Sequence, residues 1–289
     1  MSPTESTRPR HGLAWLGLLP YFGFVGLFLL WPTVIVGSEA LKAKDGSLTF
    51  DNLSKALSGE YRRAFITTTQ LSLITALAGA IIGGLLAYAV VTLERPRILK
   101  SASTTFAAVA SQLGGIPLAF AFIAALGAQG TVTVFLRDHL GFDPADAGFN
   151  LFSFRGLAVV YLYFQIPLMM IVILPAVEGL RPAWQEAAAN LGASRWRYWR
   201  HVGLPILMPS ALAGTILLFA NSFAAYATAY ALTAGQVNLV AIQIGFFLSG
   251  NVLDDPGLGY ALAFWMIVVI AIAITAYLLL QRRAARWLR

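Results

Sequence analysis

The chain has 289 residues, of which 58% are hydrophobic and only 11% are charged. Soluble globular domains carry roughly 25% charged residues, so this composition is typical of a protein that lies in a membrane. There is no cysteine, which excludes disulfides, zinc–thiolate sites, iron–sulfur clusters and thiol nucleophiles. In such a protein a formal net charge of +7 first raises the question of which membrane face the Lys and Arg residues occupy, and no nucleic-acid partner is expected.

Six stretches without acidic or basic side chains are long enough to cross a bilayer, which takes about 20 apolar residues per helix. Their unbroken hydrophobicity argues against a β-barrel, whose strands of about 10 residues alternate in polarity. The first stretch is longer than a signal-peptide core, so we expect it to be retained as a helix. We therefore predict an all-α polytopic membrane protein with a single domain at 1–289 and spans near 12–36, 65–93, 103–129, 156–177, 210–234 and 259–281.

The distribution of basic residues predicts the orientation. With the amino terminus inside, 13 of the 20 Lys and Arg residues fall on the cytoplasmic side, which predicts that both termini are cytoplasmic. The external loop 37–64 weakens this asymmetry, although four acidic residues offset its five basic ones. We expect this loop to cap the helices at the membrane surface, with a short amphipathic helix through Leu53, Ala56 and Leu57.

Glycine and proline mark special positions within the spans. Gly79 and Gly83 lie four residues apart, which lets another helix backbone approach closely. At 114–117 the sequence Gly-Gly-Ile-Pro predicts a kink or break, because proline lacks a backbone donor and clashes with the preceding turn. Irregular backbone in a membrane lines a watery path or is buried in protein, so both a pathway segment and a simple packing kink remain open.

Uncharged polar residues within the spans are candidates for a solute path, because polar groups in a membrane face protein or water. The alternative role for each of them is hydrogen bonding between helices. The candidates are Gln112, Gln165 and Asn221, together with Tyr226 and Tyr230 on the expected fifth helix.

The segment 179–205 predicts two short helices joined by a glycine. Pro182 suits the first turn of a helix, Gly192 suits the left-handed residue that ends one, and Ser194 suits the cap of the next. Tryptophans at 184, 196 and 199 fall on apolar stripes, and arginines at 195, 197 and 200 lie opposite. Taken alone, this pattern describes a pair of interfacial helices with aromatic anchors.

A more specific interpretation comes from the motif Glu186-Ala187-Ala188, then Gly192, then Val202-x-Leu204-Pro205. With the flanking Leu191–Gly192–Ala193–Ser194, it resembles the EAA loop of binding-protein-dependent ABC importer permeases, and the six-span layout resembles the type I importer fold. Trp199 stands where that family often has phenylalanine. The resemblance implies that the loop docks on a cytoplasmic ATPase through Glu186, Ala187, Ala188, Gly192, Ala193 and Ser194.

The resemblance also implies the function: a permease subunit that forms half of a solute path in the bacterial inner membrane. No Walker A sequence occurs, so we expect no catalytic residue, metal or cofactor on this chain, with ATP and Mg²⁺ held by a separate ATPase dimer. Further implied partners are an extracytoplasmic solute-binding protein, the lipid bilayer, and a second permease that is a sister chain rather than a second copy.

The substrate prediction rests on residues 175–182, which resemble the permease group that handles polyamines, aminoalkylphosphonates and similar small charged solutes. A sugar-type permease is the alternative. A secondary transporter fits less well, because such proteins use ionisable residues within their spans. A membrane-embedded hydrolase is also disfavoured, because His11, His139 and His201 all lie outside the spans.

Overall fold

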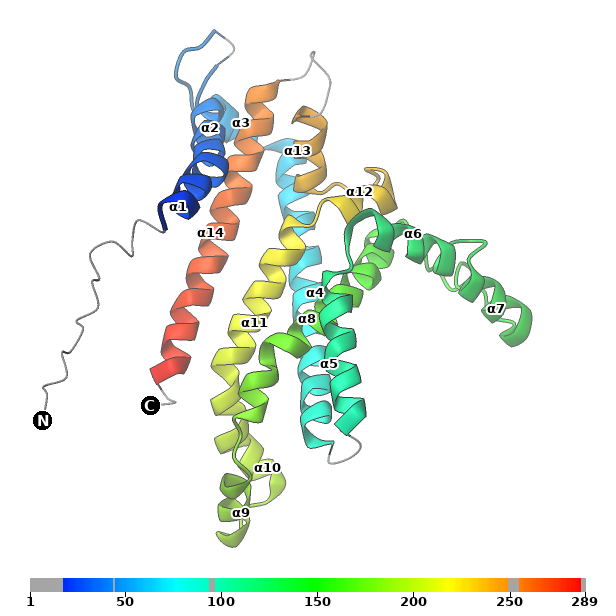
Figure 1. Ribbon diagram of the computed structural model, residues 1–289. Helices are drawn as coiled ribbons and strands as arrows, with labels where there is room; N and C mark the ends of the chain where they lie inside the picture. Colours follow the sequence, from blue (N-terminus) through cyan, green and yellow to red (C-terminus); the bar gives the residue numbers. More distant parts are fainter. Residues whose placement is uncertain (1–17, 44, 94–96, 249–254, 287–289) are drawn as a thin grey trace, which may run out of the picture.

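The computed structural model describes residues 18–43, 45–93, 97–248 and 255–286. These residues form helices, with an isolated antiparallel bridge between Lys42 and Leu48. Within the described ranges, six helical segments are long and apolar enough to cross a membrane, which confirms the predicted all-α polytopic fold. The long helices run side by side (Figure 1): α4 (Gly59–Thr92), α8 (Phe154–Glu178), α11 (Leu204–Ala224) and α14 (Pro256–Arg286), with the shorter α5 (Arg97–Gln112) against α8.

Small residues let α4 and α8 approach closely, as the sequence predicts. A Cβ atom on Gly83 would lie 2.5 Å from the Ile166 carbonyl oxygen and 2.8 Å from Met169 Cβ. At Gly79 it would lie 3.0 Å from Gln165 Cβ. The two backbones can therefore touch only because glycine stands at these positions.

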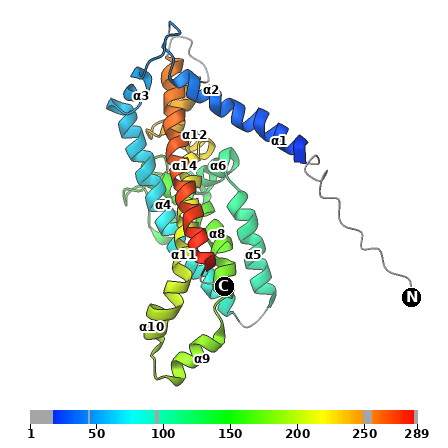
Figure 2. The same cartoon turned by 90° about the vertical axis from the view of Figure 1, so that its left-hand side faces the viewer.

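The N-terminal arm, residues 19–40, leaves the bundle. It consists of α1 (Leu19–Val25), a π-helical turn (Gly26–Leu30) and α2 (Trp31–Ala40). Its far end packs on α14 through the buried Ala40, whereas α1 has no buried residue and points away from the other helices (Figure 2). Residues 12–17 of the first expected span lie outside the described ranges.

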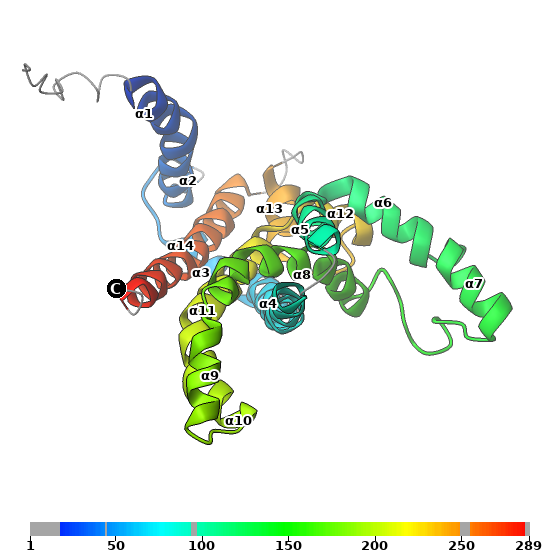
Figure 3. The ribbon, with the colours of Figure 1, turned by 60° about the horizontal axis from the view of Figure 1, so that its bottom comes forward.

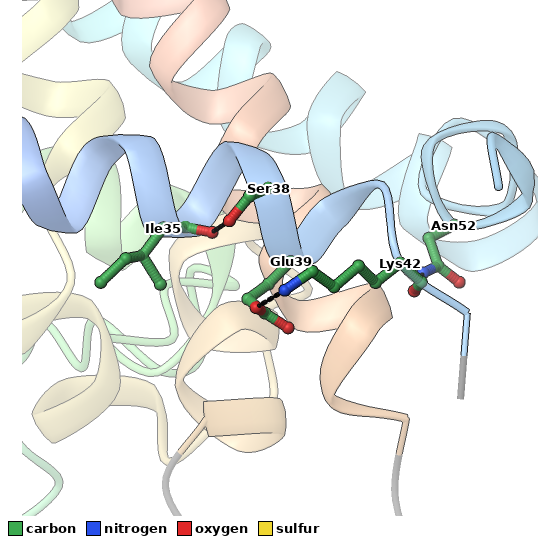
Figure 4. A network of polar contacts seen from close by, with 5 residues as sticks. All are labelled: Ile35, Ser38, Glu39, Lys42 and Asn52. Atoms are coloured by element: carbon green, nitrogen blue, oxygen red, sulfur yellow. Dashed lines mark hydrogen bonds and ion pairs between the residues drawn. The ribbon is translucent and has the colours of Figure 1, made fainter. Parts of the chain in front are cut away.

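The loop at 37–64 ties the N-terminal arm to α14. Its short helix α3 (Asp51–Lys55) lies where the sequence predicts one. The Asn52 amide donates to the Lys42 carbonyl at 2.8 Å beside the Glu39–Lys42 ion pair (Figure 4), and the indole of Trp265 on α14 donates to the Leu53 carbonyl at 3.1 Å. The loop thus closes over one end of the bundle.

The helices break within two of the expected spans, the first of them at the Gly-Gly-Ile-Pro sequence where a kink or break is predicted. The span expected at 103–129 is split: α5 ends at Gln112 and α6 (Gly115–Leu126) starts in a new direction, followed by α7 (Thr131–Leu140), which extends from the bundle on the side opposite the N-terminal arm (Figure 3). The span expected at 210–234 is also split, into α11 and α12 (Ala227–Thr233), with α13 (Val240–Leu248) after it.

Candidate functional site

The first helix break joins α5 to α6 at the Gly-Gly-Ile-Pro sequence. Gly115 has a φ of +71°, a left-handed conformation that costs glycine little, and Gly114 is extended with a φ of −145°. Pro117 has no N–H with which to continue the α5 ladder. The Gly115 N–H instead donates to Thr228 Oγ1 on α12 at 2.7 Å. The break is thus a kink of the expected kind that also makes a tertiary contact.

The second break joins α11 to α12 at Ala225, which has an extended conformation with φ −71° and ψ 108°. Its carbonyl oxygen accepts a hydrogen bond from the Tyr161 hydroxyl on α8 at 2.9 Å. Tyr226 and Tyr230 therefore lie at a break and on a short helix, which corrects their placement on a continuous fifth helix. No glycine or proline stands between Ile216 and Thr233, so the local sequence carries no strong signal for this break.

The two breaks face each other across a cavity of about 340 Å³, here called the break cavity. Three of the five predicted path residues line it, contributed by three different segments: Gln112, Asn221 and Tyr226. None of its lining side chains is charged. Its further polar lining comes from Ser111 and Thr228, and Phe164 of α8 forms apolar wall.

Gln165 does not line the break cavity. It is fully buried, and its amide nitrogen donates to the Leu218 carbonyl at 3.1 Å and to Thr75 Oγ1 at 3.4 Å. Thr75 in turn lies 3.1 Å from the Ser222 hydroxyl. The alternative role of interhelical hydrogen bonding therefore describes Gln165, which ties α8 to α4 and α11 directly behind the cavity wall.

Tyr230 lies beside the cavity rather than in its lining. Its ring stacks on that of Tyr226, with centroids 5.5 Å apart and planes at 19°, and meets the edge of Phe246 on α13. The prediction also missed Thr228 and Tyr161, whose hydroxyl groups satisfy the backbone at the two breaks. Polar groups next to Gly114–Pro117 are not recognisable from sequence when they come from distant helices.

The segment 179–205 forms the two short helices that the sequence predicts. Helix α9 (Pro182–Asn190) ends before Gly192, whose φ is +75°, and Ser194 Oγ accepts from the Arg197 N–H at the start of α10 (Arg195–Tyr198). A π-helical turn, η3 (Trp199–Gly203), then continues directly into α11. Both helices extend beyond the bundle at the end opposite α3 (Figure 1).

The predicted coupling residues stand on the open side of this segment. Helix α9 has no buried residue. Glu186, Ala187, Gly192 and Ser194 are exposed, while Ala188 and Ala193 are half-buried. Two large apolar side chains are also open: Leu191 is 88% exposed and Trp196 is 70% exposed. These two side chains give the exposed turn apolar surface.

Comparison with protein families decides the identity. Residues 19–286 match the family described as "Binding-protein-dependent transport system inner membrane component". The chain belongs to this family. It is a multi-pass inner-membrane protein and an ABC importer permease subunit. The predicted fold class and the family resemblance are confirmed.

Individual relatives agree with this assignment. The permease is 27% identical to the inner membrane ABC transporter permease protein YdcU of Escherichia coli strain K12, over 91% of this chain and 84% of the relative. It is 26% identical to the putative ferric transport system permease protein FbpB 1 of Haemophilus influenzae, over 55% of this chain but only 24% of the relative's length. A molybdenum transport system permease, ModB of Escherichia coli, is 32% identical over 37% of this chain and 44% of the relative.

Among solved structures, the fold is similar to a chain of a bacterial ABC transporter "involved in the import of the acidic polysaccharide alginate". The TM-score is 0.68 at 20% identity, covering 95% of each chain. A second structure of such a transporter, in complex with a periplasmic protein bound to an alginate pentasaccharide, gives a TM-score of 0.66.

Proposed function

We propose that the chain forms one half of a solute path that includes the break cavity, and that the segment 179–205 couples this path to a separate ATPase. The observation that carries the proposal is the pairing of the family match with an exposed two-helix segment at one end of the bundle. From here on the segment 179–205 is called the coupling loop.

The chemistry of the coupling loop suits docking to a protein. Ala187 and Ala188 allow a close approach, the Glu186 carboxylate can accept hydrogen bonds from an arginine or backbone N–H groups, and Gly192 sets a tight reversal between the two helices. Leu191 and Trp196 supply exposed apolar area, and buried aromatic side chains dominate many protein interfaces. An ATPase that covers the loop would bury both side chains.

The break cavity suits a path because irregular backbone within a membrane is tolerated where it lines water or is buried. Its polar groups are neutral: amides from Gln112 and Asn221 and hydroxyls from Tyr226, Thr228 and Ser111. Such groups can hydrogen-bond a passing polar solute without holding it as a fixed charge would.

The proposed orientation places the coupling loop and both termini in the cytoplasm, because 13 of the 20 Lys and Arg residues then lie inside. The opposite end, with α3 and the 37–64 loop, then faces the solute-binding protein. The N-terminal arm exposes apolar residues such as Leu29, which is 66% exposed. We propose that a second permease, a sister chain, packs beside this one in the membrane and completes the solute path.

For the substrate we propose a small polar or charged solute, with polyamines and phosphonates first because of the sequence at 175–182. The names of relatives add ferric iron, molybdate and sulfate to the set to be tested. The test is uptake into liposomes that hold the assembled transporter with ATP inside, using labelled putrescine, aminoethylphosphonate, sulfate, molybdate, ferric citrate and maltose. ATP-dependent uptake of maltose alone would support the sugar-type alternative, and uptake that follows an ion gradient without ATP would support a secondary transporter.

The coupling role is tested with Glu186→Ala combined with Gly192→Pro. Proline cannot adopt the φ of +75° found at Gly192, so the turn must change shape. We expect membrane insertion to persist while co-purification of the ATPase and ATP-driven uptake are lost. The matched control, Glu60→Ala with Gly46→Pro, makes the same two changes at exposed positions of the opposite end, where Gly46 has a φ of +82°, and should retain the ATPase. Loss of the ATPase in the control alone would contradict the proposal.

A further inference from the structure

The coupling loop is joined to the bundle asymmetrically. On one side, α8 ends at Glu178, whose carboxylate pairs with Lys100 at 2.9 Å on the exposed surface. On the other side, α10, η3 and α11 form one continuous helical path, because Trp199, Gly203 and Leu204 all have helical backbone angles. Any displacement of α10 therefore passes directly into α11, which ends at the break cavity.

The π-helical turn η3 lies at the junction of the loop and the bundle. A π-helical turn inside an α-helix is uncommon and frequently occurs at functional sites. Here it places Trp199 over Gly203: a Cβ atom on Gly203 would lie 2.6 Å from Trp199 Cε3 and 2.9 Å from Cζ3. The indole thus occupies a slot that exists because residue 203 has no side chain.

The Trp199 ring also meets α4. Its centroid lies 5.1 Å from that of Tyr88, with the planes at 83°, an edge-to-face geometry that is favourable for aromatic pairs. The ring also packs against the buried cluster that includes Ala87, Val90 and Leu207. Its neighbour Tyr198 is only 5% exposed. By contrast, α9 has no buried residue.

We infer that Trp199 is the positioning residue of the coupling loop: its ring, wedged between Tyr88 and Gly203, makes α10 and α4 move together and so passes displacement of the loop to the helices around the break cavity. This inference rests on the proposed coupling function. Trp199 acts through the loop residues and not by binding solute or nucleotide.

The first test measures solute moved per ATP hydrolysed in liposomes that hold the full transporter, using the solute found in the uptake panel. Trp199→Ala should lower this ratio roughly fivefold, the size expected for one residue of a coupling path, and Trp199→Phe should restore most of it because a ring remains. Gly203→Ala, which closes the slot, should lower the ratio as well. If Trp199 merely fills space, uptake and hydrolysis will fall in parallel and the ratio will stay unchanged, which would overturn the inference.

A double-mutant cycle tests whether Trp199 and Tyr88 act through one shared contact. Tyr88→Leu and Trp199→Ala remove the two sides of one contact, so the double variant should show a ratio no lower than that of the worse single variant. If the fold-losses of the two single variants multiply in the double variant, the two residues act independently. That result would contradict the inference about Trp199.

A third readout follows the geometry itself. The chain has no cysteine, so spin labels can be placed cleanly at Arg195→Cys on α10 and Ile81→Cys on α4, both exposed positions that are not assigned to ATPase docking. In the background with Trp199, we expect a narrow distance distribution in each of two states, without nucleotide and with ATP–vanadate. When Trp199→Ala is added, we expect a broad distribution. An equally narrow distribution in the Trp199→Ala background would overturn the inference.

The coupling role of the loop and the positioning role of Trp199 can fail separately. If Glu186→Ala with Gly192→Pro abolishes coupling while the Trp199 variants leave the ratio and the distances unchanged, the proposed function stands and the inference about Trp199 falls. If no ATPase co-purifies with the wild-type chain and the Trp199→Ala distances match wild type, both fall.

Discussion

The break cavity and the coupling loop show two ways in which one chain handles irregular backbone. At the cavity, the backbone groups freed by the breaks have partners on distant helices, with Thr228 accepting from Gly115 and Tyr161 donating to Ala225. At the coupling loop, α9 and α10 satisfy their ends locally through Ser194 and the turn at Gly192; α9 buries no residue, and α10 buries Tyr198 alone. The cavity region is held by contacts between distant helices, whereas α9 and the Gly192 turn are exposed.

The largest effect is expected where the core behind the cavity is tightest. Gly83→Val should destabilise the protein by about 3 kcal/mol, because the new side chain must push the Ile166 carbonyl and Met169 away. Gly84→Val is the matched control, since the nearest atom to its Cβ position, in Ile173, is 4.0 Å away. Unfolding of the purified protein in mixed detergent–SDS micelles measures the difference. Equal stability of the two variants would show that α4 and α8 do not pack as described.

A smaller loss is expected at the break itself. Thr228→Val keeps the shape but removes the acceptor of the Gly115 N–H, which should cost about 1–2 kcal/mol and lower ATP-driven uptake. Thr233→Val is the control, because that buried hydroxyl donates to the Ala229 carbonyl one turn back in the same helix. The same SDS titration and the uptake assay should separate the two variants. Unchanged stability and uptake in Thr228→Val would contradict the claim that this hydrogen bond ties the two breaks together.

The coupling loop should respond in the opposite way. Leu191→Ala with Trp196→Ala changes two exposed side chains, so unfolding should shift by less than about 0.5 kcal/mol. Recovery of the ATPase on affinity purification should nevertheless fall strongly, because interfaces depend on a few large apolar anchors. A stability loss as large as that of Gly83→Val would mean that the loop belongs to the core, and the contrast between the two regions would be lost.

The smallest effect is a pH dependence at the end opposite the coupling loop. The Ser47 hydroxyl and backbone N–H both donate to Asp45, and they lower the pKa of that carboxyl below its ordinary value of 3.8. The lowered pKa means that the charged carboxylate stabilises the turn above pH 3.8 and that this contribution is lost as the pH falls through the lower folded pKa. Hydrogen exchange at the Ser47 amide should therefore become less protected under acid, while protection at Gly115 stays constant. A parallel loss at both sites would indicate global unfolding instead.

The sequence predicts much of this fold because membrane spans and loop caps leave local signals. Pro182, Gly192 and Ser194 mark the ends of α9 and α10, and Gly114–Pro117 marks the first break. The second break is not predictable in this way, since the Tyr161 hydroxyl that bonds the extended Ala225 comes from a distant helix. The same limit applies to Gln165, whose polar side chain could equally face a path or a helix until its partners Leu218 and Thr75 are placed.

The central claim, that the coupling loop rather than the opposite end meets the ATPase, is tested most directly by photo-crosslinking in the intact transporter. A photoreactive amino acid at position 191 and another at position 48 probe two leucines of nearly equal exposure, 88% for Leu191 and 84% for Leu48, at opposite ends of the bundle. We predict a crosslink to the ATPase from position 191 and none from position 48. A crosslink to the ATPase from position 48 alone would invert the proposed orientation and contradict the coupling role of the 179–205 segment.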